Sequence, residues 1–395
     1  MNYKSLIPWT VFYLAITSVA ILFLSGSHIP KISLMVLSLI AIYLNLETLK
    51  HENTFVALKD LFVPFLPWII STIILACVHS FSGLSYFYNS CFLLVLIFLA
   101  LSPIPVQRHH LLWACGLLLL ATSFLISFYV LNNQLGSNIF GVNKNKVLYV
   151  TALLSGCCLS SYISGYQTLG KPLKSVLLAS VALSLVSIVL SEVRLVFLAY
   201  LSFIFLLVAY PRKEFRKFIV LSVFIFLLLI VFSLLTGRLQ QGFDNLAQFQ
   251  AGNSNTSWGI RLELWDLALR AFVEKPLFGW GDDPYHAITA AGIEFGVPTL
   301  PSPHFHSDMM HSLAYGGIIG FVGLIATYTV LCWQSRKDFT RLAVIIAMIS
   351  MGLVDRFWAH WITLYPFILL WLLLYVTAPD QKEKNNESQH HCSGI

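Results

Sequence analysis

Long apolar stretches, separated by short polar segments, repeat along almost the whole chain. A helix that crosses a membrane needs about 20 mostly apolar residues, because each residue adds about 1.5 Å along the helix axis. The pattern predicts an all-α, polytopic membrane protein with about 12 transmembrane helices, the eleventh being the weakest candidate. The candidate spans are residues 7–25, 32–49, 62–81, 86–101, 111–131, 147–162, 175–190, 195–210, 218–235, 313–333, 342–353 and 361–376.

One extended polar region interrupts this pattern and divides the chain. Residues 1–236 hold the expected transmembrane helices 1–9, residues 237–312 form a large loop, and residues 313–378 hold helices 10–12. Residues 379–395 form a polar tail that we expect to be a disordered cytoplasmic end. Loops as long as 237–312 are uncommon without a functional role, so we look for chemistry there.

The large loop has local order of its own. Apolar residues recur at helical spacing over residues 258–273, which predicts a short amphipathic helix around Trp265. That helix should end before Pro276, because proline cannot continue it. Gly279 and Gly281 then indicate a turn.

The composition agrees with lipid as the main solvent. The 395 residues are 57% hydrophobic and only 11% charged, whereas soluble domains carry roughly 25% charged residues. The formal net charge is +6, but no Lys/Arg run with interleaved aromatics occurs, so we expect no nucleic-acid partner. The seven cysteines form no disulfide or metal-binding spacing.

The positions of the basic residues orient the spans. With the N-terminus inside, 15 of the 24 Lys and Arg residues fall on the cytoplasmic side, above all in the run 211–217. Because this bias sets orientation, both termini should be cytoplasmic and the large loop periplasmic. Lys144 and Lys146 fall on the outer side against the rule.

Two arginines are candidates for binding a phosphate. Arg194 opens the expected eighth helix at the outer face, and an arginine at membrane depth is costly enough to suggest function. The alternative is an interfacial arginine, or an ion pair with Glu192. Arg261 lies in the amphipathic helix of the loop, where the alternative is a solvated surface residue.

A histidine cluster closes the loop, at His304, His306 and His311. Histidine is the usual side chain for proton transfer near neutral pH, and His306 is our candidate base. The spacings of two and five residues do not match the four-residue spacing of helical metal ligands, so we expect no metal site. His304 and His311 are interpreted as loop and helix-start residues.

Two absences narrow the chemistry. The chain has no Asp-x-Asp, and the first outer loop, 26–30, has no carboxylate, which disfavours metal-dependent transfer through acidic clamps. It also has no phosphate-binding loop of the ATPase type, so we expect no cofactor.

His306-Ser307, nine residues and then Gly317-Ile318-Ile319-Gly320 resembles the signature of bacterial O-antigen ligases. Arg261, followed by Pro276-Leu277-Phe278-Gly279-Trp280-Gly281, resembles the upstream segment of the same ligase/polymerase superfamily. Arg194 resembles its other arginine at a helix start. Ser307 departs from the pattern, because Asn is commoner after the histidine.

The resemblance implies a glycosyltransferase of the bacterial inner membrane that acts in lipopolysaccharide biosynthesis at the periplasmic face. It would move O-antigen from undecaprenyl pyrophosphate to a sugar hydroxyl of the lipid A-core, with inversion and without metal. Arg194 and Arg261 would hold the pyrophosphate, and His306 would take the acceptor proton. Further substrate contacts are expected around the other motif residues, Ser307, Gly317 and Gly320.

Other functions stay open. An O-antigen polymerase has similar chemistry with a lipid-linked acceptor, and a protein glycosylation enzyme is a further relative. A transporter or flippase for lipid-linked sugars is the alternative from a different class, although such proteins usually show internal repeats and charged helices near the midplane. Asp355 and Arg356 lie at the outer end of the penultimate span, where they can line the site, and we assign them no role.

Overall fold

The computed structural model describes residues 63–79, 107–132, 138–139, 142–165, 167–191, 195–210, 216–235, 237–253, 255–281, 304–358 and 360–377. The spans expected at 7–25, 32–49 and 86–101 and the tail 379–395 lie outside these residues. The described chain is helical, apart from a hairpin of two two-residue strands, β1 (Asn138–Ile139) and β2 (Val142–Asn143).

The helices follow the order expected from the hydrophobic pattern, with a 3-10 turn at Val63–Phe65 ahead of the first. They are α4 (Leu66–Val78), α6 (Arg108–Leu131), α7 (Lys144–Ser164), α8 (Lys171–Ser191), α9 (Leu195–Ala209), α10 (Arg216–Leu235), α11 (Arg238–Gln250), α12 (Gly259–Glu274), α14 (Asp308–Ser335), α15 (Phe339–Gly352) and α16 (Trp361–Val376). Among the described residues α6, α7, α8 and α14 are long and apolar enough to cross a membrane, and α4, α9, α15 and α16 are shorter apolar helices. The expectation of a helical membrane protein is thus confirmed.

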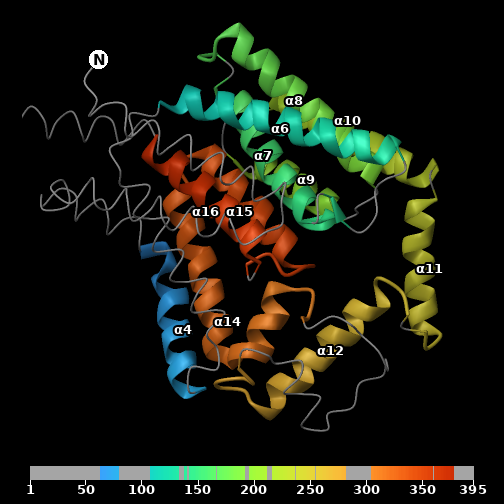
Figure 1. Cartoon of the computed structure of the whole chain (residues 1–395), viewed down its shortest axis with the longest axis vertical. Helices are drawn as coiled ribbons and strands as arrows, with labels where there is room; N and C mark the ends of the chain where they lie inside the picture. The colour runs from blue at the N-terminus through green and yellow to red at the C-terminus, as the bar shows by residue number, and fades with distance from the viewer. Residues whose placement is uncertain are drawn as a thin grey trace, which may run out of the picture.

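Helix α7 lies at the centre of the bundle. It contacts α6, α8, α9, α15 and α16 (Figure 1). In its most apolar window 83% of the residues are buried, against 44% in α6 and 39% in α8. The run Ser155–Ser161 consists almost wholly of small residues, which let neighbouring helices approach closely. The position of α7 therefore follows from its composition, whereas α6 and α8 expose apolar sides as lipid-facing helices do.

An ion pair ties two helix starts together at one end of the bundle. Arg108, the first residue of α6, donates to both carboxylate oxygens of Asp338 at 2.7 and 2.9 Å. Asp338 also caps α15 by accepting from the backbone N–H groups of Thr340 and Arg341. Burial alone would raise the pKa of Asp338, but Arg108 outweighs it and the pKa lies below its usual value. Because α15 runs from this end to Gly352, the residues that follow α15 emerge at the opposite end of the bundle.

Helix α14 is interrupted where the sequence suggested one continuous span. Gly317 has φ 57° and ψ −149°, a conformation that strongly favours glycine, and the helix kinks there. The loop segment Pro276–Gly281 docks into the kink. Trp280 N–H donates to the Ala314 carbonyl at 2.9 Å, and Ile318 N–H donates to the Pro276 carbonyl at 2.8 Å. The loop thus satisfies backbone groups that the interrupted helix leaves open.

The glycines of α14 also bring helices together. A Cβ on Gly316 would lie 2.5 Å from Leu75 of α4, and one on Gly323 would lie 2.2 Å from Ser71 of the same helix. Figure 1 shows α4 and α14 running beside one another. Their close approach therefore depends on the absence of side chains at these positions.

In the large loop, the helix expected over 258–273 is confirmed as α12, and it ends two residues before Pro276. Helix α11 was not expected. It follows α10 directly and runs down the edge of the molecule, away from the direction of α10 (Figure 1).

Candidate functional site

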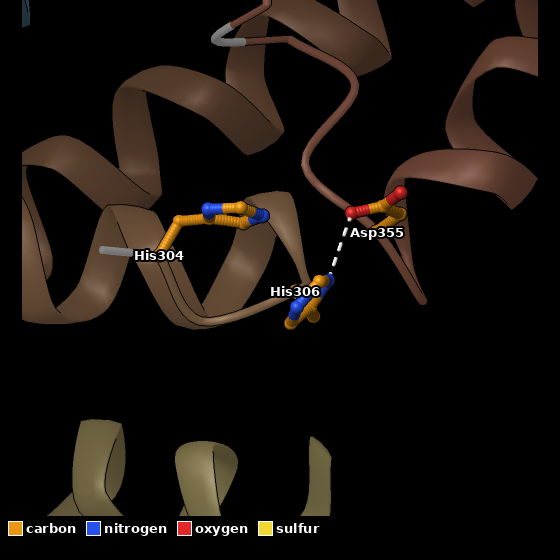
Figure 2. Close-up of side chains that lie close together, drawn as sticks. All are labelled: His304, His306 and Asp355. Atoms are coloured by element: carbon orange, nitrogen blue, oxygen red, sulfur yellow. Dashed lines mark hydrogen bonds and ion pairs between the residues drawn. The ribbon is translucent and has the colours of Figure 1, made fainter. Parts of the chain in front are cut away.

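The site forms where two loops meet at one end of the bundle. His306 precedes α14, Asp355 follows α15, and the imidazole Nδ1 lies 3.1 Å from Asp355 Oδ1 (Figure 2). The Asp355 side chain is 4% exposed and that of His306 is 24% exposed, so the carboxylate is buried while the imidazole reaches the surface. His306 has φ 45°, a left-handed conformation that non-glycine residues rarely adopt and that often marks functional positions.

Asp355 is held from two further directions by α7. The Tyr149 hydroxyl donates to Asp355 Oδ2 at 2.6 Å, and Lys146 Nζ lies 3.6 Å from the same oxygen. Burial alone would raise the pKa of Asp355, but Lys146 and the hydrogen bonds from His306 and Tyr149 outweigh it. The pKa of this carboxyl therefore lies well below its usual value. Asp355 is an anion at neutral pH, and an anion at this place keeps a proton on His306 Nδ1.

Lys146 explains an exception noted in the sequence. Its position on the outer side went against the orientation rule, and its side chain is only 9% exposed. A buried lysine needs a partner, and Asp355 supplies one. Lys146, one of the two lysines that go against the orientation rule, is thus a member of this polar cluster.

The two loops are locked together by Asp308, the first residue of α14. Its carboxylate accepts the Trp358 N–H at 2.8 Å and the Tyr328 hydroxyl at 3.2 Å. A Cβ on Gly352 would lie 2.4 Å from Asp308 Oδ2, so glycine is required there. These contacts hold Asp308, which follows His306 by two residues, against Trp358, which follows Asp355 by three.

Arg261 of α12 reaches the same place. Its Nε donates to the carbonyl of Val354, the residue before Asp355, at 3.3 Å, and its Nη1 donates to the Ser257 carbonyl. The buried face of α12 packs against Phe305 and Ala314, the first of which precedes His306. The structure therefore brings His306 and Arg261 together, as the sequence suggested.

The other residues singled out in the sequence have different surroundings. Arg194 lies outside the described residues, directly before the start of α9 at Leu195. Ser307 caps α14 by accepting the Met310 N–H at 3.4 Å. A Cβ on Gly317 would lie 2.6 Å from the Pro276 carbonyl oxygen, and one on Gly320 would lie 3.0 Å from that of Ser312. Each of the last three thus has a contact within the protein, and their contact with substrate stays a prediction.

His304 and His360 flank the site. The ring centroid of His304 lies 4.4 Å from that of His306 and 5.5 Å from that of His360. Burial, aided by the nearby positive groups, lowers the pKa of His304 to about 3 and places that of His360 below its usual value. Both rings are therefore neutral at neutral pH. His311 lies in the first turn of α14, as expected, and is buried.

Three side chains have the arrangement of metal ligands. One ligand atom each from His304, His306 and Asp355 lie within 4.8 Å of one another (Figure 2). The three histidines of the sequence, for which we expected no metal site, do not form this triad, because Asp355 takes the place of His311. Lys146 and Arg356 oppose a cation here, since both contribute positive charge near His304. The surroundings favour an anion.

The sequence indicated that Asp355 can line the site but gave it no role, and it did not assign Lys146 or Tyr149 to the site. Asp355 lies 206 residues from Tyr149 and 49 from His306, so no local pattern joins them. The available signals were the position of Asp355 at the outer end of its span and the exceptional position of Lys146.

Apolar space lies deeper in the bundle. A cavity of about 130 Å³ opens between α7, α8, α9 and α10, lined by Tyr162, Val181, Phe203 and Phe226 among others. Its lining on α7 begins at Leu159, ten residues and about 15 Å along the helix from Tyr149. Its lining is largely apolar, as the surroundings of a lipid chain are.

The fold and the site define a helical membrane protein with a buried, charge-rich polar site at one end of its bundle. A family model described as O-antigen ligase matches residues 179–325, which include Arg194, Arg261, His306, Ser307, Gly317 and Gly320. Over these residues the chain is therefore similar to the O-antigen ligase family. An 85-residue stretch is also 32% identical to an uncharacterized protein of Haemophilus influenzae, and covers 21% of this chain and 21% of that protein. The chain thus matches about a fifth of that relative's length.

Proposed function

We propose that this protein is an O-antigen ligase of the bacterial inner membrane. It transfers O-antigen polysaccharide from undecaprenyl pyrophosphate to a sugar hydroxyl of the lipid A-core at the periplasmic face. The observation that carries this proposal is the pairing of His306 with Asp355 at 3.1 Å, beside the guanidinium of Arg261. A base and a fixed positive charge are what the transfer needs, and the family match adds the substrate class.

His306 acts as the general base. Its Nδ1–H donates to the ionised Asp355, so Nε2 carries the lone pair that takes the acceptor proton. As the proton leaves, the acceptor oxygen bonds to the anomeric carbon and the bond from that carbon to the pyrophosphate oxygen breaks. The electron pair of the broken bond stays on the pyrophosphate. One displacement of this kind inverts the anomeric carbon.

Arginine charge supports the leaving group. Undecaprenyl pyrophosphate leaves as a polyanion, and a guanidinium binds phosphate oxygens in pairs. Arg261 is held in place by two backbone carbonyls, and charge that is already oriented is usually the largest catalytic contribution. Arg194 is assigned the same role from the family resemblance. Because the donor is already activated and arginines supply the charge, the reaction needs neither ATP nor metal.

The donor lipid is expected to run into the bundle. The apolar cavity between α7 and α10 begins about 15 Å along α7 from Tyr149. A polyprenyl chain that enters at the site can extend into this space while its pyrophosphate stays near the arginines.

An O-antigen polymerase is the alternative within the superfamily, and a transporter of lipid-linked sugars is the alternative outside it. The test is complementation of a ligase deletion strain that makes matching donor and core. Transfer of polymer onto lipid A, read as a restored ladder on a lipopolysaccharide gel, supports the ligase. If the gene restores no ladder in the ligase deletion strain but restores polymer in a polymerase deletion strain, the result favours the polymerase and overturns the proposal.

A further inference from the structure

Helix α11 carries an apolar face that the described protein leaves uncovered. Phe243 is 62% exposed and Leu246 is 44% exposed. These residues are three apart, so they share one side of the helix. Gln240, Asp244 and Gln248, each four apart from the next, form the opposite polar side.

The neighbouring helix approaches from another direction. Asn245 of α11 donates from its amide to the Ser257 hydroxyl, and its backbone carbonyl accepts the Thr256 hydroxyl, both at 3.4 Å. Asn245 lies nearly opposite Phe243 on a helical projection, because two residues turn the helix by about 200°. The start of α12 therefore leaves the side with Phe243 and Leu246 open.

The preceding helix shows what lies next to this face. Helix α10 has 20 residues and is about 30 Å long, close to the thickness of the hydrocarbon core of a bilayer, and it covers the span expected at 218–235. Its exposed residues follow one another at spacings of three or four, which makes a continuous apolar stripe: Val220, Phe224, Leu227, Val231 and Leu234. The hydrocarbon of a bilayer gives such a stripe a favourable surrounding along the full length of a helix.

The connection between the two helices is too short to leave the membrane surface. Helix α10 ends at Leu235, α11 begins at Arg238, and Gly237 between them has φ 69°. Figure 1 shows that α11 then turns away from the axis of α10. A helix that starts two residues after a span and turns aside lies along the interface, where an amphipathic helix buries its apolar face about 5–10 Å into the headgroup boundary.

We propose that α11 is an interfacial helix that binds the lipid surface through Phe243 and Leu246. It contacts the start of α12, one turn before Arg261, through Asn245. Lipid binding by α11 thereby sets the depth of Arg261 relative to the headgroups. This consequence for Arg261 rests on the proposed function, whereas the depth of α11 does not.

The test measures the depth of α11 directly. The full chain is reconstituted in lipid nanodiscs of phosphatidylethanolamine and phosphatidylglycerol with a nitroxide label on Phe243→Cys or Leu246→Cys. Matched controls carry the label on the polar side, as Asp244→Cys or Gln248→Cys. The unsubstituted chain treated with the same label gives the background from its own thiols, of which Cys77 is exposed. Collision rates with lipid-soluble oxygen and a water-soluble nickel chelate are measured by electron paramagnetic resonance.

We expect the oxygen-to-nickel collision ratio at 243 and 246 to exceed that at 244 and 248 by about fivefold or more. Equal ratios on both sides of the helix would overturn the proposal. Dipolar broadening between labels at 243, with shielding from both collision partners, would also overturn it by identifying a second copy as the occupant. The readout uses no glycosyl transfer, so failure of the ligase proposal leaves it unaffected and is distinguishable from its failure.

Discussion

Asp355 acts on the proposed reaction only through His306, which makes it a positioning residue. Its carboxylate accepts from His306 and Tyr149 and lies beside Lys146. These three partners stabilise the Asp355 carboxylate, because a buried carboxylate is costly unless positive and hydrogen-bonding groups surround it. The orientation of His306 thus depends on Asp355, which follows α15 and is held by Tyr149 and Lys146 of α7.

The substitution Asp355→Asn should lower the rate of transfer by about 10²-fold or more, because the amide no longer enforces a proton on His306 Nδ1. The rate is measured in single turnovers with saturating substrates, together with its pH profile. Asp355→Glu should recover part of the rate and the wild-type profile. An unchanged profile in Asp355→Asn would mean that the carboxylate serves the fold alone.

His304 makes the protein sensitive to acid. Its pKa is about 3 in the folded chain, below the ordinary value of 6.5, so the unfolded chain binds the proton more tightly. Stability is therefore complete above about pH 6.5 and declines as the pH falls toward 3. His304→Gln should retain stability that the wild type loses at pH 5, on the order of 2 kcal/mol, as measured by denaturation in detergent. Parallel acid profiles of the two proteins would refute this assignment.

At the scale of elements, the kink of α14 joins the loop to the bundle. The residues on either side of Gly317 exchange backbone hydrogen bonds with the segment Pro276–Gly281, and Gly279 with φ 65° passes close to the Tyr315 carbonyl. The same helix begins with the loop that holds His306. The kink therefore fixes α12 and the base relative to one another.

Gly317→Ala should destabilise this junction by about 1–3 kcal/mol, since alanine is strained at φ 57° and its Cβ would meet the Pro276 carbonyl. Gly156→Ala in α7 is the matched control, because a Cβ there meets nothing within 4 Å. Thermal unfolding of both variants in detergent gives the comparison. A Gly317→Ala protein as stable as the control would show that the kink does not need glycine.

The sequence predicts the helices better than it predicts the tertiary contacts between them. The span pattern and helix α12 follow from local periodicity, which acts over a few residues. Helix α11 was missed because its apolar residues are few among glutamines. The contact of Lys146 with Asp355 joins residues 209 positions apart, and only packing of the whole bundle creates it. The kink was not predicted, because a glycine within an apolar stretch does not by itself show where a helix is interrupted.

At the scale of the whole molecule, the orientation proposed from charge places the site outside. The residues of the site lie at the start of α7 and the end of α15, whereas the Arg108–Asp338 pair lies at the opposite end. Tyr210, which precedes the basic run in the sequence, lies at that opposite end, because its hydroxyl donates to the carbonyls of Arg336 and Lys337 at 3.3 Å.

Reporter fusions test this orientation. Alkaline phosphatase, which is active only in the periplasm, should be active when fused after Asn255 and inactive when fused after Thr377. Green fluorescent protein should give the converse result at the two positions. The reverse pattern would place the site in the cytoplasm and exclude the proposed acceptor.

The most direct test of the central claim is transfer by the purified protein in proteoliposomes. They contain undecaprenyl pyrophosphate-linked O-antigen and lipid A-core, with EDTA present throughout. The wild type should form glycosylated lipid A-core and release one undecaprenyl pyrophosphate for each transfer, and His306→Ala should be slower by about 10²–10⁴-fold while remaining folded. Equal rates for the two proteins would contradict the role of His306, and a wild type that transfers only without EDTA would contradict the metal-free mechanism.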